Sequence, residues 1–199
     1  PDACGVQVHP VPVPGVDDLR VAGDDRDPCC TCGGAHGLGE DLVARSRGVP
    51  IEGHLLIGHT HWDHIPGLPF FAPLFQAGSS WHIYGPRGLA GSLSETLAGQ
   101  MQYAYFPVAI EQLTATVQYH DLVECTFDID DITVTSRYLN HPALTLGYRL
   151  EVDGATVVYS TDHEPHDRRL ATGGDPAASR HDLDHAGLFT GADLLIHDA

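Results

Sequence analysis

The chain has 199 residues, 42% of them hydrophobic, which is enough for one domain with a sizeable core. Its 10 basic and 27 acidic residues give a formal net charge of −17, which opposes binding to the phosphate backbone of nucleic acid. No apolar run approaches the about 18 residues of a membrane helix, and no basic stretch precedes an apolar core as in a secretory signal. We therefore expect a soluble, cytoplasmic protein without a membrane partner.

Residues 1–50 are poorly patterned, because prolines interrupt any strand near the start and residues 24–28 are typical of a loop. Within this segment, Cys29, Cys30 and Cys32 could bind a structural metal, but no second cysteine pair follows at zinc-finger spacing. We therefore expect the folded domain to cover residues 51–199.

Hydrophobic patterning predicts the elements of the first half of that domain. The apolar run at 54–58 suits a buried strand, and a helix is expected after Pro66, over residues 67–77. A second strand is expected at 81–84. A second helix is expected over residues 88–102, because leucines recur there at four-residue spacing.

The second half is rich in predicted strands. Asp153-Gly154 suits a tight two-residue turn and therefore indicates a hairpin. Residues 164–187 are polar and irregular, with a short helix admitted, and a last apolar strand is expected at 193–197. This order of strands, helices and further strands predicts an α/β sandwich. The strands of this hairpin are expected at 146–152 and 155–160, and alternating or β-branched residues predict two further strands, at 126–129 and 132–138.

Four potential metal ligands, His59, His61, Asp63 and His64, fall within six residues directly after the first predicted strand. A loop leaving a strand end can turn all four side chains toward one point. Imidazoles suit a zinc-like ion, and a carboxylate with a further imidazole can hold a second ion about 3.5–4 Å away. The alternative is a histidine-rich surface loop, since the chain has 14 histidines. The intervening aspartate and the preceding strand favour the metal site.

The run from His59 to His64, followed by Ile65-Pro66-Gly67, resembles the HxHxDH signature of the metallo-β-lactamase superfamily. The resemblance covers roughly residues 51–199. It implies an α/β (α+β) fold, a four-layer αββα sandwich with a binuclear metal site at one edge.

The resemblance also implies roles for two residues farther along the chain. His141 follows a predicted strand and matches the third ligand of the first metal, although by itself it would be an ordinary loop histidine. Asp162 follows the predicted hairpin and matches the aspartate that bridges both metals. A strand-terminal aspartate is otherwise commonly a turn former or a helix cap.

Residues 191–199 resemble the phosphodiesterase-like branch of the superfamily, which includes transfer-RNA 3′-processing enzymes and cyclic phosphodiesterases. In that branch Asp198 would support the site without binding metal directly. The last histidine ligand of the second metal lies well beyond this strand in the family, whereas the chain stops at Ala199. We therefore expect a domain that is truncated at the C-terminus, with an incomplete second metal site.

From the resemblance we expect a metal-dependent hydrolase that uses a metal-bound hydroxide. Its cofactors would be two divalent ions, zinc or else manganese or iron, and Asp63 and Asp162 would be its catalytic residues. Only about 20 residues separate His141 from Asp162, which leaves no room for the RNA-binding arm of dedicated transfer-RNA processing enzymes. A phosphodiesterase acting on a small cyclic nucleotide or cyclic phosphate ester is therefore the first hypothesis, with nucleic acid disfavoured as a partner and a homodimer admitted.

Two alternatives stay open. One is a thioesterase similar to glyoxalase II, or a lactone or lactam hydrolase. The other is a non-catalytic metal-binding module, which the missing last histidine would fit.

Overall fold

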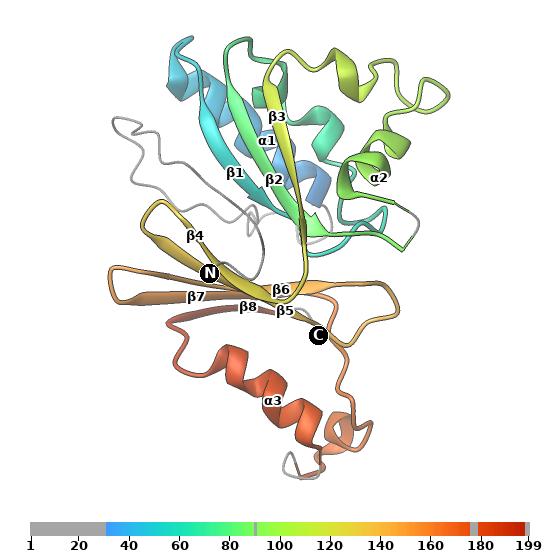
Figure 1. Cartoon of the computed structure of the whole chain (residues 1–199), viewed down its shortest axis with the longest axis vertical. Helices are drawn as coiled ribbons and strands as arrows, with labels where there is room; N and C mark the ends of the chain where they lie inside the picture. Colours follow the sequence, from blue (N-terminus) through green and yellow to red (C-terminus); the bar gives the residue numbers. More distant parts are fainter. Residues whose placement is uncertain (1–30, 90, 176–178, 198–199) are drawn as a thin grey trace. The chain divides into compact units, whose positions relative to one another are not determined.

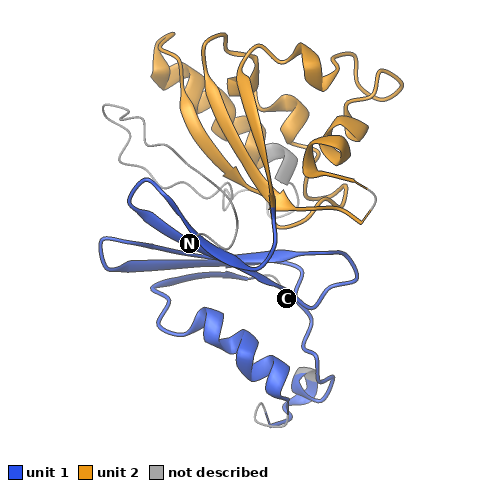
Figure 2. Cartoon of the chain, in the orientation of Figure 1, with its two compact units in different colours: residues 1–10, 122–199 blue, residues 11–121 orange. Residues whose placement is uncertain are grey.

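The computed structural model describes residues 31–89, 91–175 and 179–197. The chain divides into two compact units, one over residues 11–121 and one over residues 1–10 and 122–199 (Figure 2). The boundary between Asp121 and Leu122 carries no proline- or glycine-rich linker signal in the sequence. Among the helices of the described residues, none has the length and hydropathy that crossing a membrane requires.

The unit over residues 11–121 contains a three-stranded sheet in the order β1-β2-β3 (Figure 1). β1 and β2 run parallel. The indole ring of Trp81 lies against Gly53, and a Cβ atom on Gly53 would come within 2.4 Å of that ring. The first two strands confirm those expected at 54–58 and 81–84, while the third was not expected, because its sequence is largely polar. The strands are β1 (Glu52–Leu56), β2 (Ser80–Pro86) and β3 (Thr116–Leu122).

Helix α1 (Thr31–Ser46) lies in the segment that we expected to be poorly patterned. It contacts two short 3-10 helices, η1 (Leu68–Phe70) and η2 (Ala72–Phe75). Gly39 permits the close approach, because a Cβ there would lie 2.9 Å from the backbone nitrogen of Ala72. Glycines in α1 therefore lower its helix propensity but allow its packing.

The prediction of one helix over residues 67–77 is wrong, because the segment forms the two short 3-10 helices η1 and η2 instead. Pro69 and Pro73 have no backbone N–H and cannot donate to a continuous α-helical ladder. Phe71, between the two short helices, has an extended backbone with ψ of 96°. Proline spacing thus overrides the apolar pattern in this segment.

Helix α2 (Leu93–Gln100) is shorter than the helix expected over residues 88–102. Ser92 begins it through a capping box, in which Ser92 Oγ accepts from the Glu95 N–H and Glu95 Oε2 accepts from the Ser92 N–H. Leu89 precedes the cap and is 94% exposed. A further 3-10 helix, η3 (Ile110–Gln112), follows. The core cluster of this unit consists of Ile65, Leu68, Phe71, Leu74, Trp81, Ile83, Leu93, Leu97 and Ala115.

The unit over residues 122–199 contains a five-stranded sheet in the order β4-β5-β6-β7-β8. The first four strands pair antiparallel, and β8 pairs parallel to β7. The β6–β7 turn has φ of 51° at Asp153 and 80° at Gly154, the two positive values of a type I′ turn, so the predicted hairpin is confirmed. The strands are β4 (Cys125–Ile129), β5 (Ile132–Tyr138), β6 (Leu146–Val152), β7 (Ala155–Ser160) and β8 (Leu194–His197).

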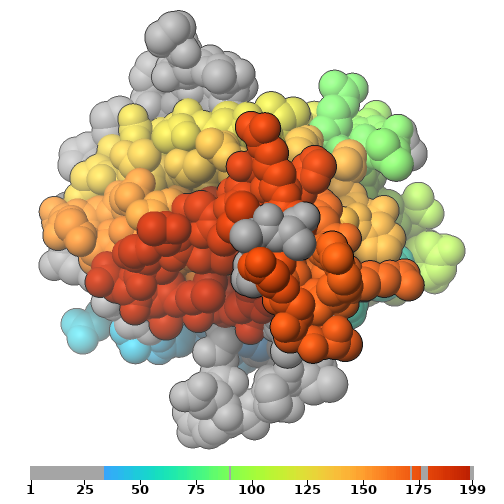
Figure 3. Space-filling view, turned by 90° about the horizontal axis from the view of Figure 1, so that it is seen from below, coloured from blue at the N-terminus to red at the C-terminus, as the bar shows by residue number. Residues whose placement is uncertain are grey.

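Helix α3 (Arg180–Phe189) lies largely in the polar segment 164–187, for which a short helix was admitted, and follows a short 3-10 helix, η4 (Leu170–Thr172). Arg149 on β6 donates to the carbonyl oxygens of Leu188 and Thr190, at 3.2 and 2.8 Å, which satisfies carbonyls at the helix C-terminus. Residues after position 160, coloured orange to red, cover much of the face seen in Figure 3. Both units combine a sheet with helices, which confirms the expected mixed α/β class.

Candidate metal centre

The histidine motif lies in the loop that follows β1. His59 is fully buried, and its ring centroid lies 4.6 Å from that of His61 and 4.2 Å from that of His64. A turn in which the His64 N–H donates to His61 O, at 3.0 Å, helps to group the rings. Asp63 Oδ2 lies 3.4 Å from His64 Nε2. The loop therefore gathers all four candidate ligands of this unit.

His141 and Asp162 lie at one edge of the five-stranded sheet in the other unit. β5 and β7 both run antiparallel to β6, so their C-terminal ends reach the same edge. His141 follows β5 and Asp162 follows β7, and His141 Nε2 lies 3.5 Å from Asp162 Oδ2. The two side chains are each 16% exposed, so the pair is largely shielded from solvent.

The predicted supporting residue Asp198 lies outside the described residues. Its neighbour His197 ends β8 and is paired in register with Ser160 of β7. Because β8 runs parallel to β7, its C-terminal end reaches the sheet edge that carries Asp162.

The chemistry of the donor set fits divalent transition metals. His59 and His61 in one unit, and His141 and Asp162 in the other, each offer one ligand atom, and imidazole nitrogens and carboxylates are ligands that zinc prefers. Asp63 and His64 add a second carboxylate and a further imidazole. The same carboxylates are compatible with manganese or iron.

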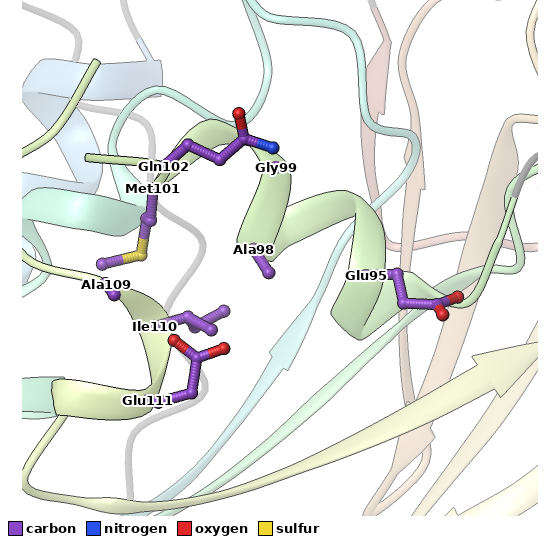
Figure 4. Close-up of a pocket in the computed structure, with 8 residues that line it drawn as sticks. All are labelled: Glu95, Ala98, Gly99, Met101, Gln102, Ala109, Ile110 and Glu111. Carbon is purple, nitrogen blue, oxygen red and sulfur yellow. The ribbon is translucent and has the colours of Figure 1, made fainter. Parts of the chain in front are cut away.

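A pocket of about 320 Å³ lies elsewhere in the unit over residues 11–121 (Figure 4). Its wall comes from α2, η3 and the segments beside them, and includes Met101 and Ile110. Glu95 and Glu111 are its only charged lining residues, and no histidine lines it. This pocket therefore lacks the donor set of the candidate metal centre.

A second group of histidines lies on the sheet of the same unit and does not belong to the motif. His82 Nδ1 lies 2.9 Å from His120 Nε2, and the two rings stack at 5.2 Å. His54 stacks on His82, and Tyr84 stacks on His120. Burial lowers the pKa of His82, against a smaller opposing effect of Glu52, and burial together with His82 lowers the pKa of His120.

This stack predicts that acid destabilises the unit over residues 11–121. Because the folded state depresses both pKa values below 6.5, the unfolded state takes up protons first as the pH falls. The free energy of unfolding should therefore decrease as the pH is lowered below about 6.5. Urea unfolding at pH 7.5 and 5.5, followed by tryptophan fluorescence, measures this. The pH dependence should shrink when His82 and His120 are both replaced by Phe, and an unchanged dependence would contradict the assignment.

Asn140 was not predicted to contribute to the site, yet it joins the two loops that carry His141 and Asp162. Its backbone N–H donates to His163 Nδ1 at 3.1 Å, and its Nδ2 donates to the carbonyl oxygen of Glu164 at 2.8 Å. The only sequence signal was its position next to His141. Its partners lie 23 and 24 residues away, beyond the reach of local patterns.

Comparisons with known proteins agree with the motif. A family model described as a beta-lactamase superfamily domain matches residues 40–199. Ribonuclease Z of Staphylococcus carnosus (strain TM300) is 32% identical over 102 residues, which are 49% of this chain and 31% of that protein. Ribonuclease BN of Cronobacter sakazakii is 32% identical over 100 residues, 49% of this chain and 30% of that protein. The chain thus spans about a third of the length of these curated relatives.

Among solved structures, the short form of human tRNase Z matches with a TM-score of 0.49 and 23% identity, over 73% of this chain and 57% of that one. The family model covers most of the chain, including all the candidate ligands from His59 to Asp162. The resemblance read from the HxHxDH motif is therefore confirmed, and the chain belongs to the beta-lactamase superfamily.

Proposed function

We propose that this chain acts as a metal-dependent hydrolase of phosphodiesters, with two divalent cations as cofactors. In this proposal His59, His61 and His141 hold the first cation, Asp63 and His64 hold the second, and Asp162 serves both. The observation that carries the proposal is the chemistry of two ligand groups, each assembled within its own unit. These are the imidazoles grouped around buried His59 and the pair of His141 and Asp162 at 3.5 Å.

When bound, such cations polarise a phosphoryl oxygen and make water a stronger acid. The chain's own contribution is to place proton acceptors at the same site. Asp63 is 76% exposed, so its carboxylate is accessible to water and can accept a proton from it. Asp162 is mostly buried and lies 3.5 Å from His141 Nε2, which suits a fixed ligand.

Two observations favour a small cyclic nucleotide or cyclic phosphate ester as the substrate. Between His141 and Asp162 the chain forms only the β6–β7 hairpin with its two-residue turn, so no additional arm arises there. The net charge of −17 opposes attraction of a polynucleotide. A second candidate is RNA, because the curated relatives are ribonucleases Z and BN.

A substrate panel tests the proposal and separates its versions. The chain loaded with zinc or manganese is assayed on bis-para-nitrophenyl phosphate, cyclic AMP, a transfer RNA with a 3′ trailer, and a thioester, each with and without chelator. Chelator-sensitive cleavage of the phosphodiesters supports the proposal, and the ratio of cyclic AMP to RNA cleavage decides the substrate. Cleavage of the thioester alone would overturn it in favour of a thioesterase. One tight metal equivalent without any turnover would identify a binding module.

A further inference from the structure

We propose that Asn140, His163 and Glu164 form a clamp that positions His141 and Asp162 for metal binding, and that His185 holds the clamp in place from α3. This inference rests on the proposed function. All of these residues lie within one compact unit, the one over residues 122–199.

The clamp consists of three hydrogen bonds between the loop after β5 and the loop after β7. The Asn140 N–H donates to His163 Nδ1 at 3.1 Å, and Asn140 Nδ2 donates to Glu164 O at 2.8 Å. In return, the Glu164 N–H donates to Asn140 O at 3.0 Å. The bonded residues directly adjoin His141 in one loop and Asp162 in the other. The bonds therefore fix the separation of the two candidate ligands.

Asp162 has a strained backbone conformation that the clamp can stabilise. Asp162 has φ of 56°, in the left-handed region that residues other than glycine adopt at a cost. Such a conformation persists where surrounding contacts determine it, and residues 163 and 164 supply these contacts directly after Asp162. Losing the clamp would let Asp162 relax and turn its carboxylate away from His141.

His185 fixes the imidazole at the centre of the clamp. Its ring stacks on that of His163 with centroids 3.7 Å apart and planes 19° apart, and it meets the Phe189 ring edge-on with centroids 4.7 Å apart. His185 Nε2 is buried and has no hydrogen-bond partner among the described residues, so the side chain acts through packing. His163 Nδ1 accepts from Asn140, which assigns the proton of the neutral ring to Nε2.

Two variants each remove one of the two hydrogen bonds that depend on a side chain, and both leave the backbone bond from Glu164 to Asn140 in place. Asn140→Ala deletes the bond to Glu164 O, and His163→Phe keeps a ring against His185 but deletes the acceptor for the Asn140 N–H. Each should weaken zinc binding about 10–100-fold, the usual effect of removing a group that orients a ligand. His163→Asn, which restores an acceptor, should recover part of the affinity. Competition with a chromophoric chelator at fixed pH measures the dissociation constant independently of activity.

Thr133→Val is the matched control, because it removes one side-chain hydrogen bond, to Asp128 at 2.9 Å, from the same sheet. It should leave zinc affinity unchanged. Circular dichroism and thermal melting of the metal-free proteins show whether a variant is unfolded. If the clamp residues had a purely structural role, the variants would have a lower Tm but no selective loss of zinc affinity. If wild type binds zinc and both clamp variants bind it equally well, the clamp is overturned and the proposed function stands. If wild type binds no zinc, both are overturned.

Discussion

Replacing His61 or Asp162 with alanine is expected to abolish both phosphodiester cleavage and the binding of one or more metal ions, with the fold retained. Each change removes a candidate ligand atom itself, so the loss should exceed the about 10–100-fold effect of removing a residue that only orients a ligand. Neither side chain belongs to the apolar core cluster, so circular dichroism should stay close to wild type. Turnover of bis-para-nitrophenyl phosphate and metal content by elemental analysis are the measurements.

Two matched substitutions control for the loss of any histidine or aspartate. His36 on α1 is about half exposed, and the side chain of Asp128 on β4 is an exposed acceptor of a hydrogen bond from Thr133. His36→Ala and Asp128→Ala should therefore keep both activity and metal content. Retained activity in the His61 and Asp162 variants would remove these residues from the site.

The largest effect on stability is expected from Phe71→Ala. Phe71 is 2% exposed, and its ring meets Trp81 edge-on at 4.9 Å. The ring also lies against Gly39, so it joins α1 to the sheet core. Truncating such a buried aromatic side chain costs about 3–5 kcal/mol of unfolding free energy. Urea unfolding followed by fluorescence measures this, because both tryptophans, Trp62 and Trp81, lie in the same unit.

Phe75 provides the comparison within the same segment. It ends η2 and is 37% exposed, so Phe75→Ala leaves no comparable cavity. We expect a cost of about 1 kcal/mol or less. Equal destabilisation by the two substitutions would show that Phe71 contributes no more to the free energy of unfolding than the partly exposed Phe75 does.

The parts of the fold that could be predicted are those whose signals are local. Asp153-Gly154 specified its turn within two residues, and the motif from His59 to His64 placed four candidate ligands in one loop. Strand β5 followed from alternating and β-branched residues, because one of its faces is buried more than the other, and β6 and β7 followed as the arms of the hairpin.

The parts that were missed depend on partners distant in sequence. A short helix was admitted near α3, but its bounds were not predicted, because its sequence is largely polar and its end is stabilised by Arg149 about 40 residues earlier. α1 is rich in glycine, so its helical state depends on packing against η1 and η2 rather than on propensity. Asn140 next to His141 forms hydrogen bonds to residues beyond the β6–β7 hairpin, which no local pattern indicates.

The contacts that attach α3 to the sheet imply that α3 and β8 open together. Arg149 bonds the end of the helix, and Leu188 lies over Gly147, where a Cβ would come within 3.3 Å of it. β8 follows α3 directly and pairs only with β7 in the described sheet. Release of the helix would therefore free the edge strand as well, and the two should behave as one foldon. Their amide protons would exchange with deuterium together, ahead of those in the central ladder of β5, β6 and β7.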